Sequence, residues 1–203
     1  EPLGEVMLRL GLEALRSWDE RGLQVPTVGI NAAASQLNNP LFFDFVRWEL
    51  DRQRVPPERL AIEVLEDIYT PSDDDPIARN LRRLSRIGVR IDLDDFGTAA
   101  TSVIGMRRYQ ATRIKIDKSY IRDIGASATN QTLVATMVQM ARNMHIESLA
   151  EGVETPAERA WLAHVGCDYI QGYVVARPMP LEESFEWLAR YRVPPPQASG
   201  QQG

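Results

Sequence analysis

Alternating strand and helix signals are the feature that most limits how this chain can fold. Helix signals occupy residues 3–21, 40–54, 73–88, 102–109, 130–144, 156–165 and 181–191. Short apolar runs typical of strands lie at 27–31, 60–66, 89–94, 112–117, 146–151 and 169–171. Each predicted strand is followed by a helix or a helix-like turn. This order predicts an α/β domain with a parallel sheet, either doubly wound or closed as a barrel.

The length of the chain limits how complete such a barrel can be. An eight-stranded β/α barrel usually needs roughly 250 residues, whereas this chain has 203 and begins on a predicted helix. We therefore expect one or two strands to be missing at the N-terminal end. We expect one domain over residues 1–191, followed by a flexible tail at 192–203 that is rich in Pro, Gly and Gln.

Net charge, cysteine content and hydropathy limit which partners and which cell compartment suit this chain. The formal net charge of -5 argues against a surface that coats a nucleic-acid polymer, which is normally basic. Cys167 is the only cysteine, so no internal disulfide can form, which fits a reducing cytoplasm. No apolar run approaches the ~20 residues of a membrane helix, so we expect no membrane contact by this domain. The chain starts at Glu1 and not at Met, so we expect it to be a piece of a longer protein. We expect this domain to be cytoplasmic, whether the longer protein is free in the cytoplasm or anchored in a membrane.

Polar residues stand at the C-terminal end of every predicted strand, where such folds place their chemistry. They are Asn31, Glu63, Glu66, Asp94, Asp95, Lys115, Asp117, Glu151, Glu154 and Gln171. A charge among apolar strand residues is costly unless it is paired or bound to a cation. These side chains are therefore expected to face a common centre.

The residue types indicate which cation would suit that centre. Oxygen ligands without a Cys or His cluster favour Mg²⁺, Mn²⁺ or Ca²⁺, and His145 and His164 fall on helix ends or surfaces. Two such ions can clamp a phosphodiester for in-line attack by water. Lys115 could hold or activate that water, and Glu151 could anchor an ion or steer the same water.

A purely structural role remains the alternative for single acids. One acid at a strand end is most often a helix N-cap or a surface ion pair, and Glu66, Asp117 and Glu154 are open to this interpretation. Six strand ends that all finish on a polar residue favour a shared site over six unrelated local roles.

Seven stretches of the chain resemble the EAL domain family, in order and over about residues 1–191. They are Val28–Leu37, Ile62–Glu66, Ile91–Thr98, Ile114–Ser119, Ala150–Thr155, Gly166–Tyr173 and Arg177–Pro180. The most specific are AEGVE and the following CDYIQGY. The family comprises bacterial cyclic di-GMP phosphodiesterases and inactive relatives that bind the ligand.

The resemblance implies a modified TIM barrel that converts cyclic di-GMP to pGpG with two Mg²⁺ or Mn²⁺ ions. By motif position, the residues that resemble metal ligands are Asn31, Glu63, Asp94, Asp95 and Glu151. Lys115 resembles the residue at the nucleophilic water, while Glu66 and Glu154 resemble acids that hold the loop after Gly97. The positions that resemble substrate contacts are Gln36, Gln171, Arg177 and Pro178. The resemblance also implies a homodimer and an upstream GGDEF or sensor domain.

Three departures from the family pattern bear on activity. The tripeptide Glu13-Ala14-Leu15 lies in a predicted helix, with Leu15 in a buried stripe and Glu13 solvated, so we expect the first strand with its metal-binding Glu to be absent. The segment 98–102 reads TAATS where the family usually has Gly-Tyr-Ser-Ser after the Thr, and Leu65 replaces a usual Thr. Two functions therefore stay open: an active phosphodiesterase, or a cyclic di-GMP receptor or protein-interaction module without activity.

Overall fold

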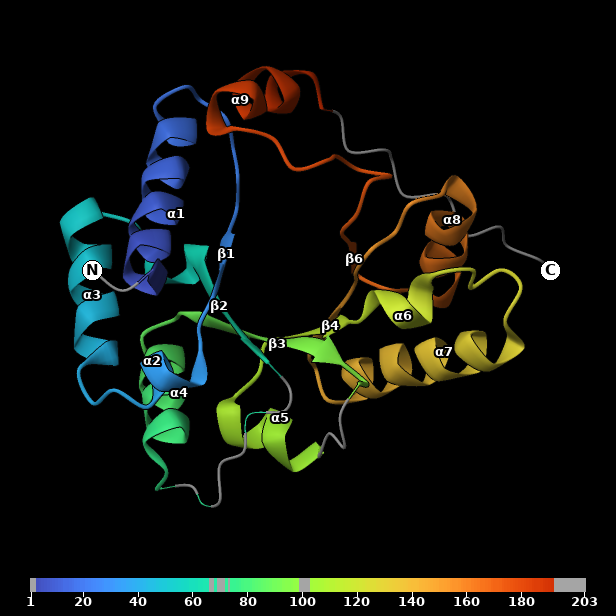
Figure 1. Cartoon of the computed structure of the whole chain (residues 1–203), viewed down its shortest axis with the longest axis horizontal. Coiled ribbons are helices and arrows are strands. Elements are labelled where there is room, and N and C mark those ends of the chain that lie inside the picture. The colour runs from blue at the N-terminus through green and yellow to red at the C-terminus, as the bar shows by residue number, and fades with distance from the viewer. Residues whose placement is uncertain (1–2, 66–67, 69–71, 73, 99–102, 192–203) are drawn as a thin grey trace.

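Six parallel strands form one curved sheet whose order follows the sequence, β1 to β6 (Figure 1). The computed structural model describes residues 3–65, 68, 72, 74–98 and 103–191, without the side chains of 103 and 104. The strands are β1 (Val28–Asn31), β2 (Leu60–Leu65), β3 (Arg90–Phe96), β4 (Arg113–Ile116), β5 (Glu147–Ala150) and β6 (Tyr169–Ile170). This curled half-barrel confirms the predicted α/β class. The predicted tail at 192–203 lies outside the described residues.

The longer helices of the described residues lie around the outside of the curved sheet, with α9 at its open side between β1 and β6 (Figure 1). They are α1 (Leu3–Asp19), α3 (Phe42–Gln53), α4 (Pro76–Arg86), α5 (Val103–Tyr109), α7 (Ala128–Asn143), α8 (Pro156–Val165) and α9 (Leu181–Arg190). Residues that commonly begin or end helices mark some of their ends. At α8, Thr155 and Glu158 form a capping box, and Gly166 ends the helix with φ 77°. The sequence therefore predicts α8 within its observed bounds.

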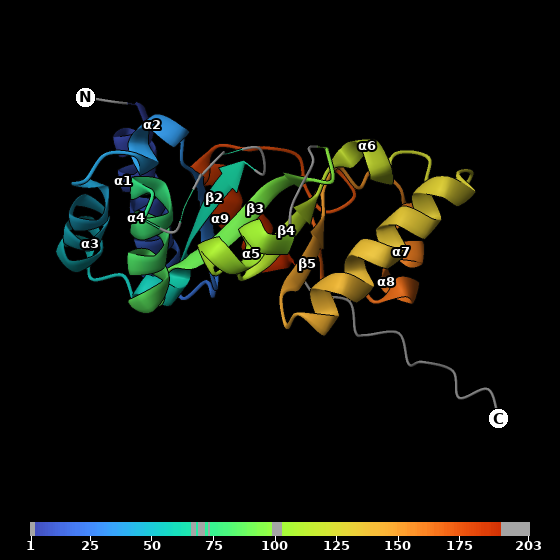
Figure 2. The ribbon, with the colours of Figure 1, turned by 90° about the horizontal axis from the view of Figure 1, so that it is seen from below.

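Three short elements were not expected from the sequence: α2 (Ala34–Leu37), the 3₁₀ turn η1 (Pro57–Arg59) and α6 (Lys118–Ile121). Each spans too few residues to show a helical apolar period. The helices α2 and α6 follow β1 and β4, so they lie at the carboxyl edge of the sheet, the upper edge in Figure 2.

The hydrophobic core lies between the sheet and the outer helices. On α1, Leu12 and Leu15 are fully buried, while Glu13 is exposed. This confirms that Glu13-Ala14-Leu15 is a segment of a surface helix. On β3 and β4 the fully buried apolar residues alternate with charged ones, so that the apolar side chains face the helices and the charged ones face the inside of the curve.

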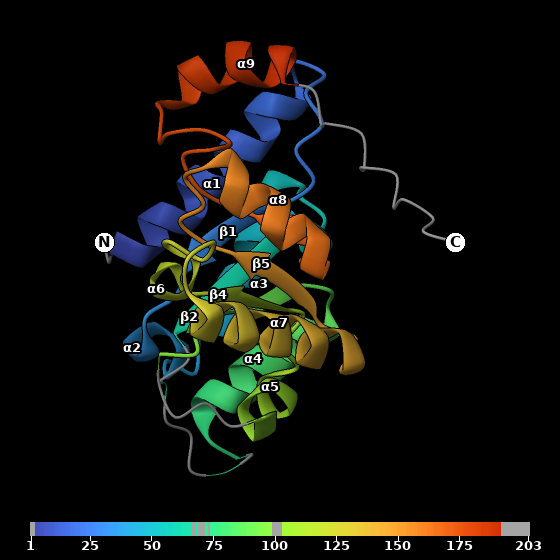
Figure 3. The ribbon, with the colours of Figure 1, turned by 90° about the vertical axis from the view of Figure 1, so that its right-hand side faces the viewer.

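Helix α9 lies against α1, although the strands β1 and β6 do not pair within the described residues (Figures 1 and 3). The indole Nε1 of Trp18 donates a hydrogen bond of 2.8 Å to Ser184 Oγ. The guanidinium of Arg21 stacks over the Phe185 ring, 3.8 Å from its centroid. The two ends of the half-barrel therefore meet through helices. Among the described helices, none has the length and apolar character needed to cross a membrane.

Candidate metal centre

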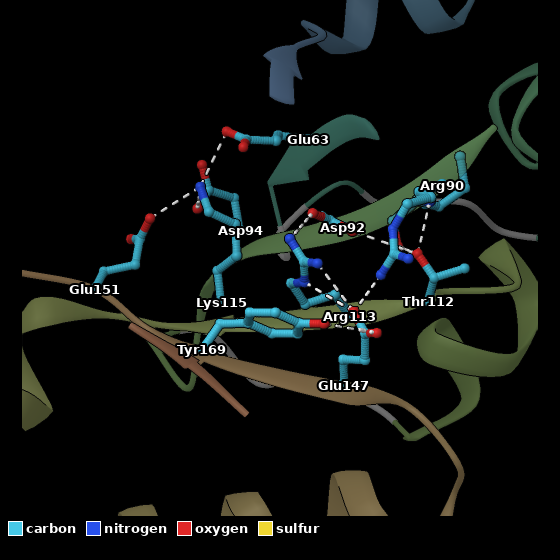
Figure 4. A network of polar contacts seen from close by, with 11 residues as sticks. Glu63, Arg90, Asp92, Asp94, Thr112, Arg113, Lys115, Glu147, Glu151 and Tyr169 are labelled. Carbon is cyan, nitrogen blue, oxygen red and sulfur yellow. Dashed lines mark hydrogen bonds and ion pairs between the residues drawn. The ribbon is translucent and has the colours of Figure 1, made fainter. Parts of the chain in front are cut away.

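The strand register places charged residues in two layers on the inner face of the sheet. Glu63 on β2 is level with Asp92 on β3, which is level with Arg113 on β4. Because side chains on a strand alternate between its faces, Asp94 and Lys115 point the same way as Asp92 and Arg113, one step closer to the carboxyl edge. We call the layer around Lys115 the upper layer, because it lies nearer the carboxyl edge, and the layer around Arg113 the lower layer. Figure 4 shows the upper layer on the left and the lower layer on the right.

Lys115 is the centre of the upper layer. Its ammonium Nζ lies 3.0 Å from Glu63 Oε2, 2.9 Å from Asp94 Oδ1 and 2.9 Å from Glu151 Oε1 (Figure 4). Only 4% of the Lys115 side chain is exposed. The structure therefore joins four polar residues from four different strand ends that the sequence predicted to face one centre.

The surroundings of Lys115 fix its protonation state. Burial alone would lower the pKa of Lys115, but the charge of Glu63 and the hydrogen bonds to Asp94 and Glu151 raise it above its ordinary value of 10.5. At neutral pH the side chain is therefore an ammonium group that donates hydrogen bonds. It has no lone pair with which to remove a proton from water.

A bulge in β3 brings two consecutive aspartates to the same place. The pairing of β3 with β4 shifts register between Leu93 and Phe96, and Asp95 adopts the left-handed conformation with φ 53°. In a regular strand Asp94 and Asp95 would point to opposite faces. Here carboxylate oxygens of Asp94, Asp95 and Glu151 lie within 4.8 Å of one another. Hydrogen bonds from the backbone N–H and side chain of Thr98 to the Asp95 carbonyl brace the turn.

The upper layer has more negative than positive charge. Burial raises the pKa of both Glu63 and Glu151 above the ordinary range, against the opposing effect of Lys115. Burial also raises the pKa of Asp95, and the nearby Asp94 charge adds to this. Four carboxylates thus share one ammonium group. This oxygen-only donor set fits divalent cations of the Mg²⁺, Mn²⁺ or Ca²⁺ type.

Gly29 on β1 provides room for one of these carboxylates. A Cβ atom at Gly29 would lie 2.1 Å from Glu63 Oε1, so any larger residue here would push the Glu63 carboxylate out of its present position. Asn31, two residues further, is level with Glu63 in the register. The end of β1 therefore lies directly beside the acidic centre.

The lower layer has as many positive as negative side chains, and it was not predicted from the sequence. Arg113 pairs with Asp92 at 3.3 Å and with Glu147 at 2.9 Å, and Arg90 also pairs with Glu147. Asp92 is 1% exposed, and burial raises its pKa despite Arg113. Two arginines and two carboxylates complete this layer at the strand starts. The alternation in Arg90-Ile91-Asp92 was the available signal.

The other predicted site residues lie around or outside this centre. Asp117 is the N-cap of α6, because its side chain accepts a hydrogen bond of 2.9 Å from Ser119 N. Gln171 is exposed after β6, and its backbone pairs with Ala150 and Val153. Glu154 is exposed at the start of α8. Glu66 lies outside the described residues.

The structure also gives the positions of the residues that the sequence predicted as substrate contacts. Gln36 belongs to α2, where its Oε1 accepts a hydrogen bond from Ala33 N and its amide packs against Gly4 of α1. Arg177 is exposed and stacks over the Tyr173 ring at 4.3 Å, and Pro178 next to it is exposed as well.

Comparison with known proteins agrees with this fold. The chain is 35% identical over 192 residues to the cyclic di-GMP phosphodiesterase NbdA of Pseudomonas aeruginosa, covering 95% of this chain and 24% of NbdA. It is 33% identical over 181 residues to the bifunctional diguanylate cyclase/cyclic di-GMP phosphodiesterase MucR of the same organism, covering 89% of this chain and 26% of MucR. The chain thus spans about a quarter of the length of these curated relatives.

Two solved structures extend the comparison. The phosphodiesterase PaMucR in complex with c-di-GMP superposes with a TM-score of 0.83 and 32% identity, covering 90% of this chain and 73% of that one. The calcium/cy-diGMP complex of BlrP1 from Klebsiella pneumoniae gives a TM-score of 0.69 and 30% identity, covering 84% of this chain and 44% of that one. The profile of the EAL domain matches residues 1–178. The chain therefore belongs to the EAL domain family.

Proposed function

We propose that this domain is a metal-dependent phosphodiesterase that hydrolyses cyclic di-GMP to pGpG in bacterial second-messenger signalling. The observation that carries the proposal is the acidic centre, in which Lys115 and the carboxylates of Glu63, Asp94 and Glu151 meet with Asp95 close by. The names of NbdA and MucR and the cyclic di-GMP bound to PaMucR support the choice of substrate.

Asn31, Glu63, Asp94, Asp95 and Glu151 would hold two Mg²⁺ or Mn²⁺ ions. When bound, such ions supply an activated water and neutralise the charge that builds up on the phosphate. The donor set consists of oxygens only, and the carboxylates exceed the ammonium groups by three. The calcium in the BlrP1 complex supports a divalent ion in a related domain.

Lys115 would act as a hydrogen-bond donor. Because its pKa is raised, its ammonium group can orient the attacking water and offset the phosphate charge. Glu151 accepts one of its hydrogen bonds and is placed to steer the same water. Gln36, Gln171, Arg177 and Pro178 are proposed substrate contacts, and Glu66 and Glu154 are proposed to hold the loop after Gly97.

The test is hydrolysis of cyclic di-GMP with Mn²⁺, followed by chromatography of the product. The protein is expressed with its natural flanking sequence. We expect pGpG from the wild type and a loss of at least about 100-fold in rate for Glu151→Gln. The exposed Glu13→Gln variant is the matched control and keeps its activity. Absence of pGpG from the wild type would refute the proposal.

One observation favours a second function, a receptor that binds cyclic di-GMP without cleaving it. The only Glu-Ala-Leu in this chain lies on α1, where Glu13 is exposed on a surface helix and is not part of a strand end. Calorimetry with the dinucleotide, in the presence and absence of metal, separates the two functions. A receptor binds without turnover, whereas the absence of any binding would exclude it.

The setting of the domain in its whole protein is part of the proposal. The bifunctional name of MucR supports a neighbouring GGDEF or sensor domain. We propose a cytoplasmic location, because cyclic di-GMP is an intracellular messenger in the family this chain belongs to. A homodimer is proposed on the same family ground, and sedimentation at micromolar concentration would test it.

A further inference from the structure

The short helix α6 lies between the two turns that carry the candidate metal ligands. On one side, the hydroxyl of Tyr120 donates a hydrogen bond to the carbonyl of Gly97, in the turn that follows Asp94 and Asp95. On the other side, a Cβ atom at Gly152 would lie 2.5 Å from Lys118 Cβ, so α6 packs closely against the turn that follows Glu151. A single small element thus contacts both ligand-bearing turns.

The turn after Asp95 has a conformation that its neighbours must support. Asp95 has φ 53° and Gly97 has φ 99°. Left-handed backbone is uncommon for a residue with a side chain, and it persists only where surrounding contacts hold it. It is this conformation that turns the Asp95 carboxylate toward Asp94 and Glu151.

Tyr120 supplies the contacts from the α6 side. A Cβ atom at Gly97 would lie 3.0 Å from the Tyr120 ring and 2.7 Å from Met137 Cε on α7. The ring therefore closes directly over Gly97, and the hydroxyl fixes the direction of its carbonyl. Helix α6 itself is anchored by Asp117, whose backbone N–H also reaches the Phe96 carbonyl at 3.4 Å.

We propose that Tyr120 is a positioning residue for the metal centre: its hydroxyl holds the turn so that Asp95 stays within reach of the same ion as Asp94 and Glu151. The inference rests on the proposed metal binding by these carboxylates. Neither the sequence motifs nor the comparisons assign a role to Tyr120.

The test compares Tyr120→Phe with the wild type in the protein with its natural flanking sequence. Phenylalanine keeps the ring over Gly97 and removes only the hydroxyl. Mn²⁺ binding is followed by electron paramagnetic resonance without substrate. We expect the Kd of the Mn²⁺ ion that Asp95 would hold to rise about three- to tenfold, the effect of one hydrogen bond, while the Kd of the other ion is unchanged. The hydrolysis rate falls at limiting Mn²⁺ and recovers at saturating Mn²⁺.

Tyr169→Phe is the matched control, because its hydroxyl bonds Glu147 in the lower layer at 3.3 Å. It is expected to leave both Mn²⁺ affinities unchanged. Equal Kd values for Tyr120→Phe and wild type, or a rate that saturating Mn²⁺ does not restore, would overturn the role of Tyr120. A wild type that binds no Mn²⁺ would overturn the metal site as well. Bound Mn²⁺ with the expected shift but no pGpG would leave Tyr120 as positioning residue and refute only the phosphodiesterase.

Discussion

Replacing Lys115 by Met should make the metal-free domain less stable and its response to divalent ions stronger. Methionine fills a similar volume but carries no charge. The ammonium group now balances Glu63, Asp94 and Glu151 at 2.9–3.0 Å. Without it, these carboxylates repel one another in a buried site, and only a bound cation can take over the missing positive charge.

The magnitude follows from burial. Removing one partner of a buried ion pair costs about 3–5 kcal/mol, and the three carboxylates are 13–17% exposed, which points to the lower end, about 3 kcal/mol. For a chain of this size that equals a fall in Tm of about 6–12 °C. Unit charges about 4 Å apart interact by about 4 kcal/mol in such surroundings, so the loss of Lys115 should tighten Mn²⁺ binding clearly.

Thermal unfolding with and without Mn²⁺ measures both effects at pH 7.5. The control is Lys118→Met, which removes an exposed lysine three residues away and should change Tm by no more than about 2 °C. The reasoning is refuted if Lys115→Met unfolds at the wild-type temperature without metal, or if Mn²⁺ raises its Tm by less than it raises that of the wild type.

Three other changes test separate features. Gly97→Ala should lower the free energy of unfolding by about 1–3 kcal/mol, because Gly97 has a positive φ. The control Gly125→Ala places its methyl group in open space and should change the free energy of unfolding by no more than about 0.5 kcal/mol. Equal urea midpoints for the two variants would contradict this. At Glu49, burial opposes ionisation but hydrogen bonds from two arginines lower its pKa from 4.5, so its stabilisation is present above pH 4.5 and is lost as the pH falls below. Wild type should therefore exceed Glu49→Gln in unfolding free energy at pH 7 and lose this advantage as the pH falls through the lowered pKa of Glu49. Asp92→Asn should lower Tm with little change in Mn²⁺ affinity, whereas Asp94→Asn should weaken Mn²⁺ binding; the reverse order would refute the division into two layers.

Local signals explain which elements the sequence could predict. Helix α8 was predicted within its observed bounds because Thr155 and Gly166 mark its ends with side-chain and backbone preferences that act over a few residues. Strand β3 was predicted to end at Asp94, but it continues to Phe96. The bulge that keeps Asp95 in the strand depends on contacts with β4 and α6, which are distant in sequence.

The residues of the acidic centre could be predicted from the sequence, but the interactions between them could not. Polar residues at strand ends share one edge of a parallel sheet, so the meeting of Glu63, Asp94 and Glu151 around Lys115 follows from topology alone. The protonation state of Lys115 does not, because it depends on three distances and on burial. The lower layer was not predicted, because its arginines lie at the starts of strands, where a charged side chain is usually solvated.

The two layers differ in one property, the balance of their charges. In the lower layer Arg90 and Arg113 match Asp92 and Glu147, so that layer is complete without a ligand and can serve the fold. In the upper layer a single ammonium group faces four carboxylates, one of them brought in by the strained turn at Asp95. A chain that needed only a stable interior would have no reason to add that fourth carboxylate, because burial penalises each unpaired charge. The surplus is intelligible as a cost that bound cations remove, which is why a change that strengthens ion binding at this edge of the sheet should lower the stability of the metal-free domain, whereas changes at the other edge should alter stability alone.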